Sequence, residues 1–296
     1  MGLNFTEIKK NTSEIAEKDV ELKEFYKQTT VYINAGGRGT RLEPVVQKGE
    51  HGITKALLRF DGDTLIEKHI KLLSKFNFGG IIVGGGDHLN LTQYLQQQDL
   101  ENVIIDNTEK QEDTGGDLIK AIRKYNCGKN ILVENVDTIL LVDNFDKLLK
   151  QHNETNALGT IVLTTKKGVP NEGAFYVDEN GKVIFSREAR NQSSVKEPNN
   201  WTGFRGSSTG AIIFSTDFLK QYNWRAGDGR LSIYKDLVPE LIEMGGLYAY
   251  DNENNFFMDV GTPDKYKQIK RHPKIFGAVG ARYLKNNNNY DDKQKK

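Results

Sequence analysis

The chain has 296 residues, of which 37% are hydrophobic and 9% aromatic, enough for one large α/β domain with or without appendages. Its 41 Lys and Arg residues balance 40 Asp and Glu residues, so composition gives no reason to expect nucleic acid or a membrane surface as a partner. No apolar run reaches the roughly 20 residues of a membrane helix, and the single cysteine, Cys127, can form no internal disulfide, so we expect a cytoplasmic protein.

The first half of the chain alternates strand-like and helix-like segments. Residues 1–28 carry sparse apolar positions among Glu and Lys, which predicts a helical extension. Beyond it, the patterns predict strands at 31–34, 80–83, 103–105 and 130–133, and helices at 64–76, 89–95 and 117–125. Strands that alternate with helices predict an α/β fold with a doubly wound, mostly parallel, Rossmann-like sheet.

The pattern changes after about residue 150. A strand is predicted at 157–164, a hairpin around the D-E-N-G turn at 178–181, a polar loop at 188–206, a strand at 211–214 and a helix at 233–244. The Asn-rich end at 285–296 is predicted to be disordered. We therefore expect one domain at 29–284, with a first half at about 29–150 and a second half at about 151–270.

The stretch Val31 to Leu42 reads V-Y-I-N-A-G-G-R-G-T-R-L. Ligands of parallel sheets lie outside the carboxyl ends of the strands, and a glycine turn there offers backbone N–H groups to anions. Arg38 and Arg41 add cations that suit phosphate. The stretch fits neither the dinucleotide motif G-x-G-x-x-G nor the P-loop, which ends in Lys-Ser or Lys-Thr. It predicts a polyphosphate site of another kind.

Three further residues strengthen this interpretation. Lys55 follows a long polar loop and precedes a predicted apolar strand, Asp137 comes just after a predicted buried strand, and Asp259 lies between an apolar run and a Gly-Thr-Pro turn. Two carboxylates at the ends of apolar segments suit Mg²⁺, which takes one or two protein carboxylates and completes its shell with water and phosphate oxygens. Each residue alone also fits a solvated side chain, a helix cap or a turn.

In these residues the chain resembles the sugar-1-phosphate nucleotidyltransferases, or NDP-sugar pyrophosphorylases. Their G-G-x-G-T-R-L motif is matched at 36–42 and their closing Asp-x-Gly-Thr-Pro at 259–263. Weaker matches follow in the same order between them, at Thr54-Lys55, Asp113-Thr114-Gly115-Gly116, Val136-Asp137 and Ser208-Thr209-Gly210-Ala211. Thr54 replaces the usual Pro, Val136 replaces the usual Gly, and the F-x-E-K-P motif is matched only loosely at 185–190. The likeness leans toward the mannose/heptose-1-phosphate guanylyltransferase branch.

The resemblance implies a fold of the nucleotide-diphospho-sugar transferase type, with an inserted antiparallel sugar-binding portion. It implies an Mg²⁺-dependent enzyme of nucleotide-sugar and polysaccharide biosynthesis that joins an NTP and a sugar 1-phosphate to give an NDP-sugar and pyrophosphate. The implied catalytic residues are Arg41, Lys55 and Asp137, with Asp137 and Asp259 as metal ligands. The implied nucleotide-binding residues are Ala35, Gly36, Gly37, Gly39, Thr40, Thr114 and Gly115, and the implied sugar-binding residues are Glu188, Thr209 and Gly210. We expect Asp137→Ala and Arg41→Ala each to lose about 10²–10³ in rate without unfolding.

Two alternatives stay open. The weak match to F-x-E-K-P leaves room for a cytidylyltransferase that acts on a non-sugar phosphate such as phosphocholine. A non-catalytic subunit that binds a nucleotide sugar is the second, although such a protein would be expected to lose Arg41, Lys55 or an aspartate. The sequence leaves the nucleobase, the sugar and the oligomeric state open, and a homo-oligomer is one of the states it allows.

Overall fold

The computed structural model describes residues 20–37, 39–42, 54–60, 62–108, 110–140, 142, 145–165, 174–187, 197–199, 201–253 and 257–271. Residues 20–27 form a helix before the first strand, which confirms that part of the expected extension. Residues 1–19 and the expected disordered tail at 285–296 lie outside the described residues. Within the described residues, no helix is both long and apolar enough to cross a membrane.

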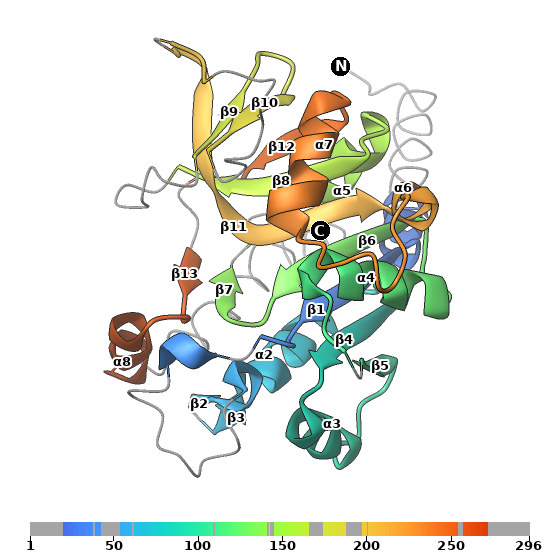
Figure 1. Cartoon of the computed structure of the whole chain (residues 1–296), viewed down its shortest axis with the longest axis vertical. Helices are drawn as coiled ribbons and strands as arrows, with labels where there is room; N and C mark the ends of the chain where they lie inside the picture. Colours follow the sequence, from blue (N-terminus) through green and yellow to red (C-terminus); the bar gives the residue numbers. More distant parts are fainter. Residues whose placement is uncertain are drawn as a thin grey trace, which may run out of the picture.

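The first half forms the parallel part of the sheet. β1 (Thr29–Asn34) lies between β4 (Gly80–Gly86) and β6 (Asn130–Asn135), and β5 (Val103–Asn107) pairs with the outer side of β4. All these pairs are parallel, as predicted, and Figure 1 shows these strands in the lower half of the molecule. Their carboxyl ends therefore meet at one edge of the sheet.

Alternating side chains of the central strand build two apolar layers. Val31 and Ile33 belong to one core and Tyr32 belongs to the other, because successive residues of a strand point to opposite faces. The first core is covered by α2 (Leu65–Leu73), α3 (Leu89–Gln96) and α5 (Phe145–Glu154). The second is covered by α4 (Asp113–Lys124), α6 (Thr216–Gln221) and α7 (Val238–Glu243). The sheet is thus doubly wound, as predicted.

The second half adds antiparallel strands to the same sheet. β11 (Phe204–Ser215) runs antiparallel to β6, to β8 (Gly159–Thr164) and to β9 (Ala174–Val177). β10 (Val183–Ser186) completes the predicted hairpin with β9, and β12 (Leu247–Asp251) is parallel to β8. The long strand bends where its register shifts between Ser208 and Ile212, and Gly210 has a φ of +84° there. That bend lets one strand join the two halves.

Short elements bring distant segments together beside this edge. η1 (Thr40–Leu42), η2 (Lys55–Leu57) and the hairpin of β2 (Arg59–Phe60) and β3 (Asp63–Thr64) follow β1 along the chain. β7 (Thr138–Leu140) follows β6 and pairs with β13 (Phe257–Asp259), which precedes α8 (Pro263–Arg271).

Three predicted elements differ from the structure. The strand expected after Lys55 is instead the turn η2, because the Thr54 hydroxyl accepts a hydrogen bond from the Ala56 amide at 3.3 Å. The loop expected at 188–206 is partly strand, since β11 begins at Phe204. The helix expected at 233–244 is two pieces, a π-helical segment η4 (Ile233–Leu237) followed by α7.

The third helix of the first half begins at Asp113, four residues earlier than predicted, so the Thr-Gly-Gly sequence is its first turn and not a turn ahead of it. The first amides of a helix have no partner within the helix. Here the amides of Gly115 and Gly116 donate to the carbonyl oxygen of Leu231 at 2.8 and 3.0 Å. A Cβ on Gly115 would lie 3.0 Å from that oxygen, so glycine makes the close approach possible.

Candidate active site at the carboxyl edge of the parallel strands

Asparagine side chains join the ends of β1 and β6. The amide nitrogen of Asn34 donates to the side-chain oxygen of Asn135 at 3.1 Å. The backbone N–H of Val136 donates to the carbonyl of Asn34, and that of Ala35 donates to the carbonyl of Gly84 at the end of β4. Hydrogen bonds therefore join the ends of three parallel strands, β1, β4 and β6. The loops that follow these strands begin next to one another.

Asp137 and Asp259, 122 positions apart in sequence, lie side by side at this edge. β7 and β13 pair so that Asp259 lies opposite Thr138, and the amide of Val260 donates to the carbonyl of Asp137 at 2.7 Å. A Cβ built on Gly261 would lie 2.8 Å from Oδ1 of Asp259 and 3.2 Å from Oδ2 of Asp137. The two carboxylates thus converge on one point, as the sequence predicted.

Cations surround this pair of carboxylates. The Lys55 ammonium donates to Oδ2 of Asp137 at 2.5 Å, with the two side chains 11% and 20% exposed. Nη2 of Arg41 lies 3.3 Å from the same point beside Gly261. Lys265 of α8 donates to Oδ2 of Asp259 at 3.0 Å. Three cations face two carboxylates, so the site has an excess of positive charge for an anionic ligand.

The carboxyl group of Asp259 is held in its ionised form. Burial raises its pKa, but hydrogen bonds from the Gly261 amide and the Lys265 ammonium, with the charges of Lys265 and Arg41, outweigh burial and leave the pKa below its usual value. An ionised carboxylate is the form that binds a divalent cation.

The donor set fits Mg²⁺ in its usual protein setting. Within the described residues, no group of three or more His, Cys, Asp and Glu side chains could hold a metal ion. Two carboxylates from separate segments converge beside Gly261, where a side chain would fill the space between them. Mg²⁺ commonly takes one or two protein carboxylates with phosphate oxygens and water, so Asp137 and Asp259 suit a metal that arrives with a phosphorylated ligand.

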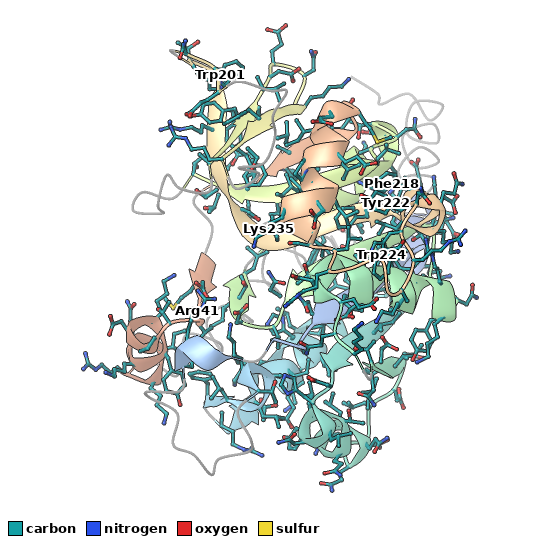
Figure 2. The ribbon with its side chains drawn as sticks, in the orientation of Figure 1. Arg41, Trp201, Phe218, Tyr222, Trp224 and Lys235 are labelled. Atoms are coloured by element: carbon teal, nitrogen blue, oxygen red, sulfur yellow. The ribbon has the colours of Figure 1, made fainter. Side chains whose placement is uncertain are left out.

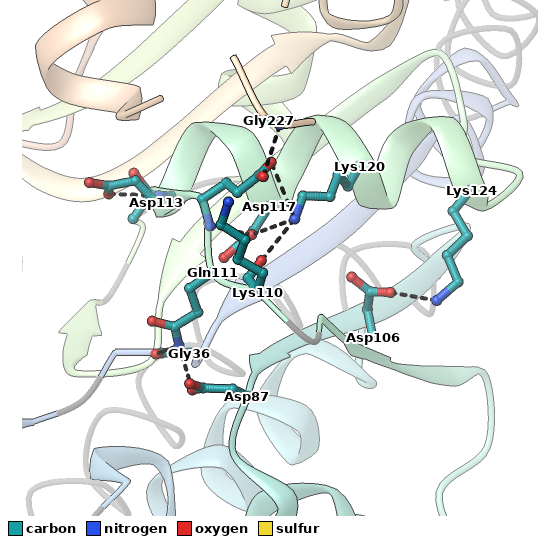
Figure 3. A network of polar contacts seen from close by, with 12 residues as sticks. Gly36, Asp87, Asp106, Lys110, Gln111, Asp113, Asp117, Lys120, Lys124 and Gly227 are labelled. Atoms are coloured by element: carbon teal, nitrogen blue, oxygen red, sulfur yellow. Dashed lines mark hydrogen bonds and ion pairs between the residues drawn. The ribbon is translucent and has the colours of Figure 1, made fainter. Parts of the chain in front are cut away.

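The glycine stretch lies next to the loop that follows β4. A Cβ on Gly36 would approach the backbone of Gly86 to 3.2 Å, so the two loops pack backbone to backbone. The carbonyl of Gly36 accepts a hydrogen bond from the side-chain amide of Gln111 at 2.5 Å, and the same amide donates to Asp87 at 3.1 Å (Figure 3). Gly37 has nothing within 4 Å of an added Cβ and is exposed, so its backbone is accessible to a ligand.

The remaining nucleotide-binding predictions fall in or beside this region. Gly39 has a φ of +65°, and its carbonyl accepts a hydrogen bond from the amide of Leu42. This bond closes the turn η1, which begins at Thr40. Thr114 and Gly115 lie at the start of α4, three and four residues after Gln111, and the hydroxyl of Thr114 accepts from the amide of Ile233. Their role in nucleotide binding stays a prediction. Arg38 lies outside the described residues.

Of the three predicted sugar-binding residues, the structure describes two, Thr209 and Gly210. Glu188 lies outside the described residues. Thr209 is fully buried and its hydroxyl donates to the carbonyl of Val162 at 2.9 Å, so that hydroxyl is used within the protein. Gly210 backs onto the active-site edge, because a Cβ there would lie 3.0 Å from the amide nitrogen of Asn135 and 3.1 Å from the hydroxyl of Thr138. Sugar binding by these residues stays a prediction.

A family model described as the MobA-like NTP transferase domain matches residues 31–231. The chain belongs to this family. The match contains the glycine stretch, Lys55 and Asp137, and the structure adds β13 with Asp259 to the same edge. This family membership confirms the resemblance to nucleotidyltransferases that was seen in the sequence.

Individual relatives of this NTP transferase are distant. The chain is 26% identical over 246 residues to the mannose-1-phosphate guanylyltransferase catalytic subunit beta of Danio rerio, covering 79% of this chain and 61% of that one. It is 23% identical over 258 residues to a putative mannose-1-phosphate guanyltransferase of Sulfolobus acidocaldarius, covering 84% and 66%. The chain thus spans less than two thirds of the length of these relatives.

Solved structures share its fold. HddC from Yersinia pseudotuberculosis, complexed with GMP-PN, aligns with a TM-score of 0.64 at 20% identity, over 82% of this chain and 98% of that one. The inositol-1-phosphate CTP transferase from T. maritima aligns with a TM-score of 0.62 at 13% identity, over 86% and 96%. These likenesses establish the mixed α/β architecture of this NTP transferase, with its mostly parallel central sheet.

Two polar side chains of this NTP transferase were not singled out in the sequence. Lys235 of η4 is exposed, and among the described parts of the chain its ammonium has no hydrogen-bond or ion-pair partner. In the view of Figure 2 it lies on the side of η4 toward β7, while Arg41 lies beside α8. Gln111 is the second group. A lone Lys in a helix and a lone Gln in a loop carry no sequence signal, so only the packing of distant segments reveals them.

The segment that carries Lys235 is tied to the active-site edge through β11. The hydroxyl groups of Tyr234 and Ser208 lie 2.9 Å apart, and the same Ser208 oxygen accepts from the amide of Gly210 at 3.1 Å. Gly210 in turn contacts Asn135 and Thr138, on either side of Asp137. Tyr234, the neighbour of Lys235 in η4, is thus linked through β11 to the segment that carries Asp137.

Proposed function

We propose that this NTP transferase is an Mg²⁺-dependent sugar-1-phosphate nucleotidyltransferase. The observation that carries the proposal is the convergence of Asp137, Asp259 and Arg41 on one point beside Gly261, at the edge where the parallel strands end. A site with ionised carboxylates and surplus cations suits the union of two phosphorylated substrates, in which the main task is to bring anions together and neutralise their charge.

In the proposed reaction, a phosphate oxygen of the sugar 1-phosphate attacks the α-phosphorus of the NTP. A new P–O bond forms, the bond between the α- and β-phosphates breaks, and pyrophosphate leaves with its electron pair. The attacking phosphate is already an anion, so the site needs no strong general base. Mg²⁺, when bound, would neutralise phosphate charge as it develops.

The chain's own residues have separable roles in this proposal. Asp137 and Asp259 hold the metal ion, and the Gly36–Gly39 backbone binds the NTP. Arg41, on the first-half side, stabilises the leaving phosphates. Lys55, in contact with Asp137, faces the reacting phosphates. Lys235, on the second-half side, binds the phosphate of the acceptor.

We place a guanine nucleotide first among the NTPs. Both relatives named above are called mannose-1-phosphate guanylyl- or guanyltransferases, and the HddC structure holds GMP-PN. Mannose-like or heptose-like 1-phosphates are accordingly the first acceptors to test. The cytoplasmic location expected from the single cysteine stays a prediction.

A second candidate is a cytidylyltransferase for a non-sugar phosphate. The weak match to F-x-E-K-P favours it, because the acceptor contacts of the sugar enzymes are the ones this chain matches least. The fold it shares with the inositol-1-phosphate CTP transferase is compatible with that activity. The two candidates differ in both the base and the acceptor, so one substrate panel separates them.

The experiment starts with thermal-shift measurements of the four NTPs with Mg²⁺. A ligand at 100 times its Kd adds roughly 2.7 kcal/mol to stability, so the preferred base gives the largest shift. Pyrophosphate release is then measured for that NTP with a panel of sugar 1-phosphates, inositol 1-phosphate and phosphocholine. No shift with any NTP, or shift without pyrophosphate release on any acceptor, would contradict the proposed enzyme.

The active-site assignment is tested by Asp137→Asn, which we expect to lower kcat by about 10²–10³ with little change in Tm. Asp63→Asn is the matched control, because Asp63 is also ion-paired with a lysine, at 2.7 Å from Lys71, but lies in the β2–β3 hairpin. Near-normal turnover by Asp137→Asn would refute the assignment of the metal site.

A further inference from the structure

His69 is a buried residue of α2 whose two ring nitrogens both face hydrogen-bond acceptors. Its Nε2 lies 3.1 Å from the carbonyl oxygen of Val136, and its Nδ1 lies 3.4 Å from Oε2 of Glu134. The side chains of His69 and Glu134 are only 9% and 11% exposed. Because a carbonyl oxygen can only accept, Nε2 carries a hydrogen and donates it to Val136.

The second ring nitrogen of His69 faces Glu134. The 3.4 Å contact between Nδ1 and Oε2 joins two largely buried side chains, one on α2 and the other on β6. Glu134 therefore helps to hold the imidazole ring in the orientation in which Nε2–H donates to Val136.

The acceptor of this hydrogen bond belongs to the peptide that carries Asp137. The Val136 N–H donates to the carbonyl of Asn34 at 3.1 Å, and the Asp137 carbonyl accepts from Val260 at 2.7 Å. His69 supplies the remaining contact, on the carbonyl of Val136. A peptide group is planar, so a fixed carbonyl also fixes the plane from which the Asp137 backbone continues.

The helix that carries His69 is itself firmly placed. Thr64 and Glu67 form a capping box at its start, with the Thr64 amide donating to Glu67 at 2.7 Å. Leu65, Ile66 and Ile70 pack in the first core beneath β1 and β6. A rigid helix therefore presents the imidazole to the end of β6.

We propose that His69 is a positioning residue for nucleotidyl transfer: it orients the Val136–Asp137 peptide and, through it, the Asp137 carboxylate for a divalent cation. This inference rests on the proposed function, because it assumes that Asp137 binds the metal. Residues that orient a metal ligand typically change metal affinity or activity by about 10- to 100-fold when they are removed.

The simplest variant, His69→Leu, leaves Glu134 buried without its partner, which is strongly destabilising. The informative variant is therefore the double change His69→Leu with Glu134→Leu, since apolar replacement of a buried ionic pair is commonly tolerated. Glu134→Gln is the conservative partner variant, because the Gln amide can donate to Nδ1 while Nε2–H still reaches Val136. His152→Leu is the control, a buried histidine of α5 whose Nδ1 contacts Thr160 at 2.8 Å.

The direct measurement is Mn²⁺ binding by electron paramagnetic resonance on the folded variants in the presence of NTP, together with kcat, KM and Tm. We expect the double variant to bind Mn²⁺ about 10- to 100-fold more weakly and to lose kcat without a matching change in the KM for NTP. Glu134→Gln should bind Mn²⁺ close to wild type. His152→Leu should lower Tm alone.

Two results would overturn the inference: wild-type Mn²⁺ binding by the folded double variant, or equal loss in the double variant and in Glu134→Gln, which would assign the effect to the carboxylate. Failure of the proposed function gives a different result. In that case Asp137→Asn would bind Mn²⁺ as well as wild type does.

Discussion

The two halves of this NTP transferase differ in how well their sequence landmarks map onto a site. In the parallel half, Lys55 and Asp137 were expected at the edge beyond the first strand, and they form an ion pair there. In the antiparallel half, Asp259 reaches that edge through the pairing of β13 with β7, whereas Thr209 is fully buried and its hydroxyl donates to the carbonyl of Val162. Sugar binding by Thr209 stays a prediction. In both halves the family motifs are matched in the same order along the chain, so the order of the motifs does not explain this difference.

The difference follows from strand direction. Parallel strands all end at the same edge, so a polar residue that follows any buried strand is placed at that edge before the structure is known. Antiparallel strands end at alternate edges, and β11 also bends at Gly210, so position along the chain does not tell which side chain faces the ligand. The comparison shows that strand-end reasoning places Asp137 directly, whereas Asp259 reaches the same edge through the antiparallel pairing of β13 with β7.

The largest effect is expected from Gly261→Ala, at the point where Asp259 of the second half meets Asp137 of the first. The new Cβ would lie 2.8 Å from Asp259, 3.2 Å from Asp137 and 3.3 Å from Arg41, so all three side chains would have to move. These atoms are the ends of side chains, so the fold should survive. We expect kcat to fall by about 100-fold, measured by pyrophosphate release, since small misplacements of reacting groups carry costs of that order.

Gly246→Ala is the matched control for that variant in the antiparallel half. Its Cβ would crowd the Leu158 side chain at 2.7 Å, a similar steric conflict without a functional group. We expect a lower Tm and unchanged kcat. Equal kcat values for the two alanine variants would contradict the idea that the site is concentrated at the parallel edge.

Lys235→Met tests whether the antiparallel half contributes to binding the acceptor. A hydrogen bond to a charged group is worth about 1.5–3 kcal/mol, so losing this cation should raise the KM for the acceptor phosphate about tenfold or more. The KM for the NTP should not change, because the proposed function assigns the NTP phosphates to Arg41 and Lys55. Steady-state kinetics with each substrate varied in turn measures the two values.

Lys220→Met, a change of an exposed lysine on α6, is the control for charge alone. If both methionine variants raise the KM for the acceptor to the same extent, the effect is long-range electrostatics. If Lys235→Met raises the KM for NTP as much as that for the acceptor, the assignment of the acceptor phosphate to Lys235 is wrong.

The smallest effect on catalysis is expected from a second buried histidine. In the antiparallel half, burial, with a smaller contribution from the charge of Lys129, lowers the pKa of His152 from 6.5 to about 4. Above pH 6.5 this residue is neutral in both the folded and the unfolded chain. As pH falls from 6.5 toward 4, the unfolded chain takes up the proton first, so stability decreases, and below 4 the loss is complete.

One pKa unit corresponds to about 1.4 kcal/mol, so His152 should remove up to about 3 kcal/mol of stability over this interval. Urea unfolding at pH 7 and pH 5 covers the upper 1.5 pH units of this interval, from 6.5 to 5, where we expect a loss of about 2 kcal/mol. His152→Gln is the reference that lacks this titration. A wild type that loses no more stability than His152→Gln between these pH values would contradict the assignment. Turnover at pH 7 by the folded variant should equal that of wild type.

The sequence by itself determined the alternation of strands and helices, the glycine turn after the first strand and the two acidic landmarks, because these depend on local periodicity and on residues adjacent in the chain. It could not place the start of α4 at Asp113, since the Leu231 carbonyl that satisfies its first amides lies more than 100 residues away. It also could not single out His69, which is one position within the helix predicted at 64–76.

Only the tertiary structure decided which of these residues meet. The pairing of β7 with β13 brings Asp259 to Asp137, and α2 brings His69 to the carbonyl beside it. Such contacts join segments separated by tens to more than 100 residues, and their distances follow from the packing of the whole sheet and its helices. Local patterns do not encode those distances, so a functional residue without a motif of its own becomes visible only in the folded chain.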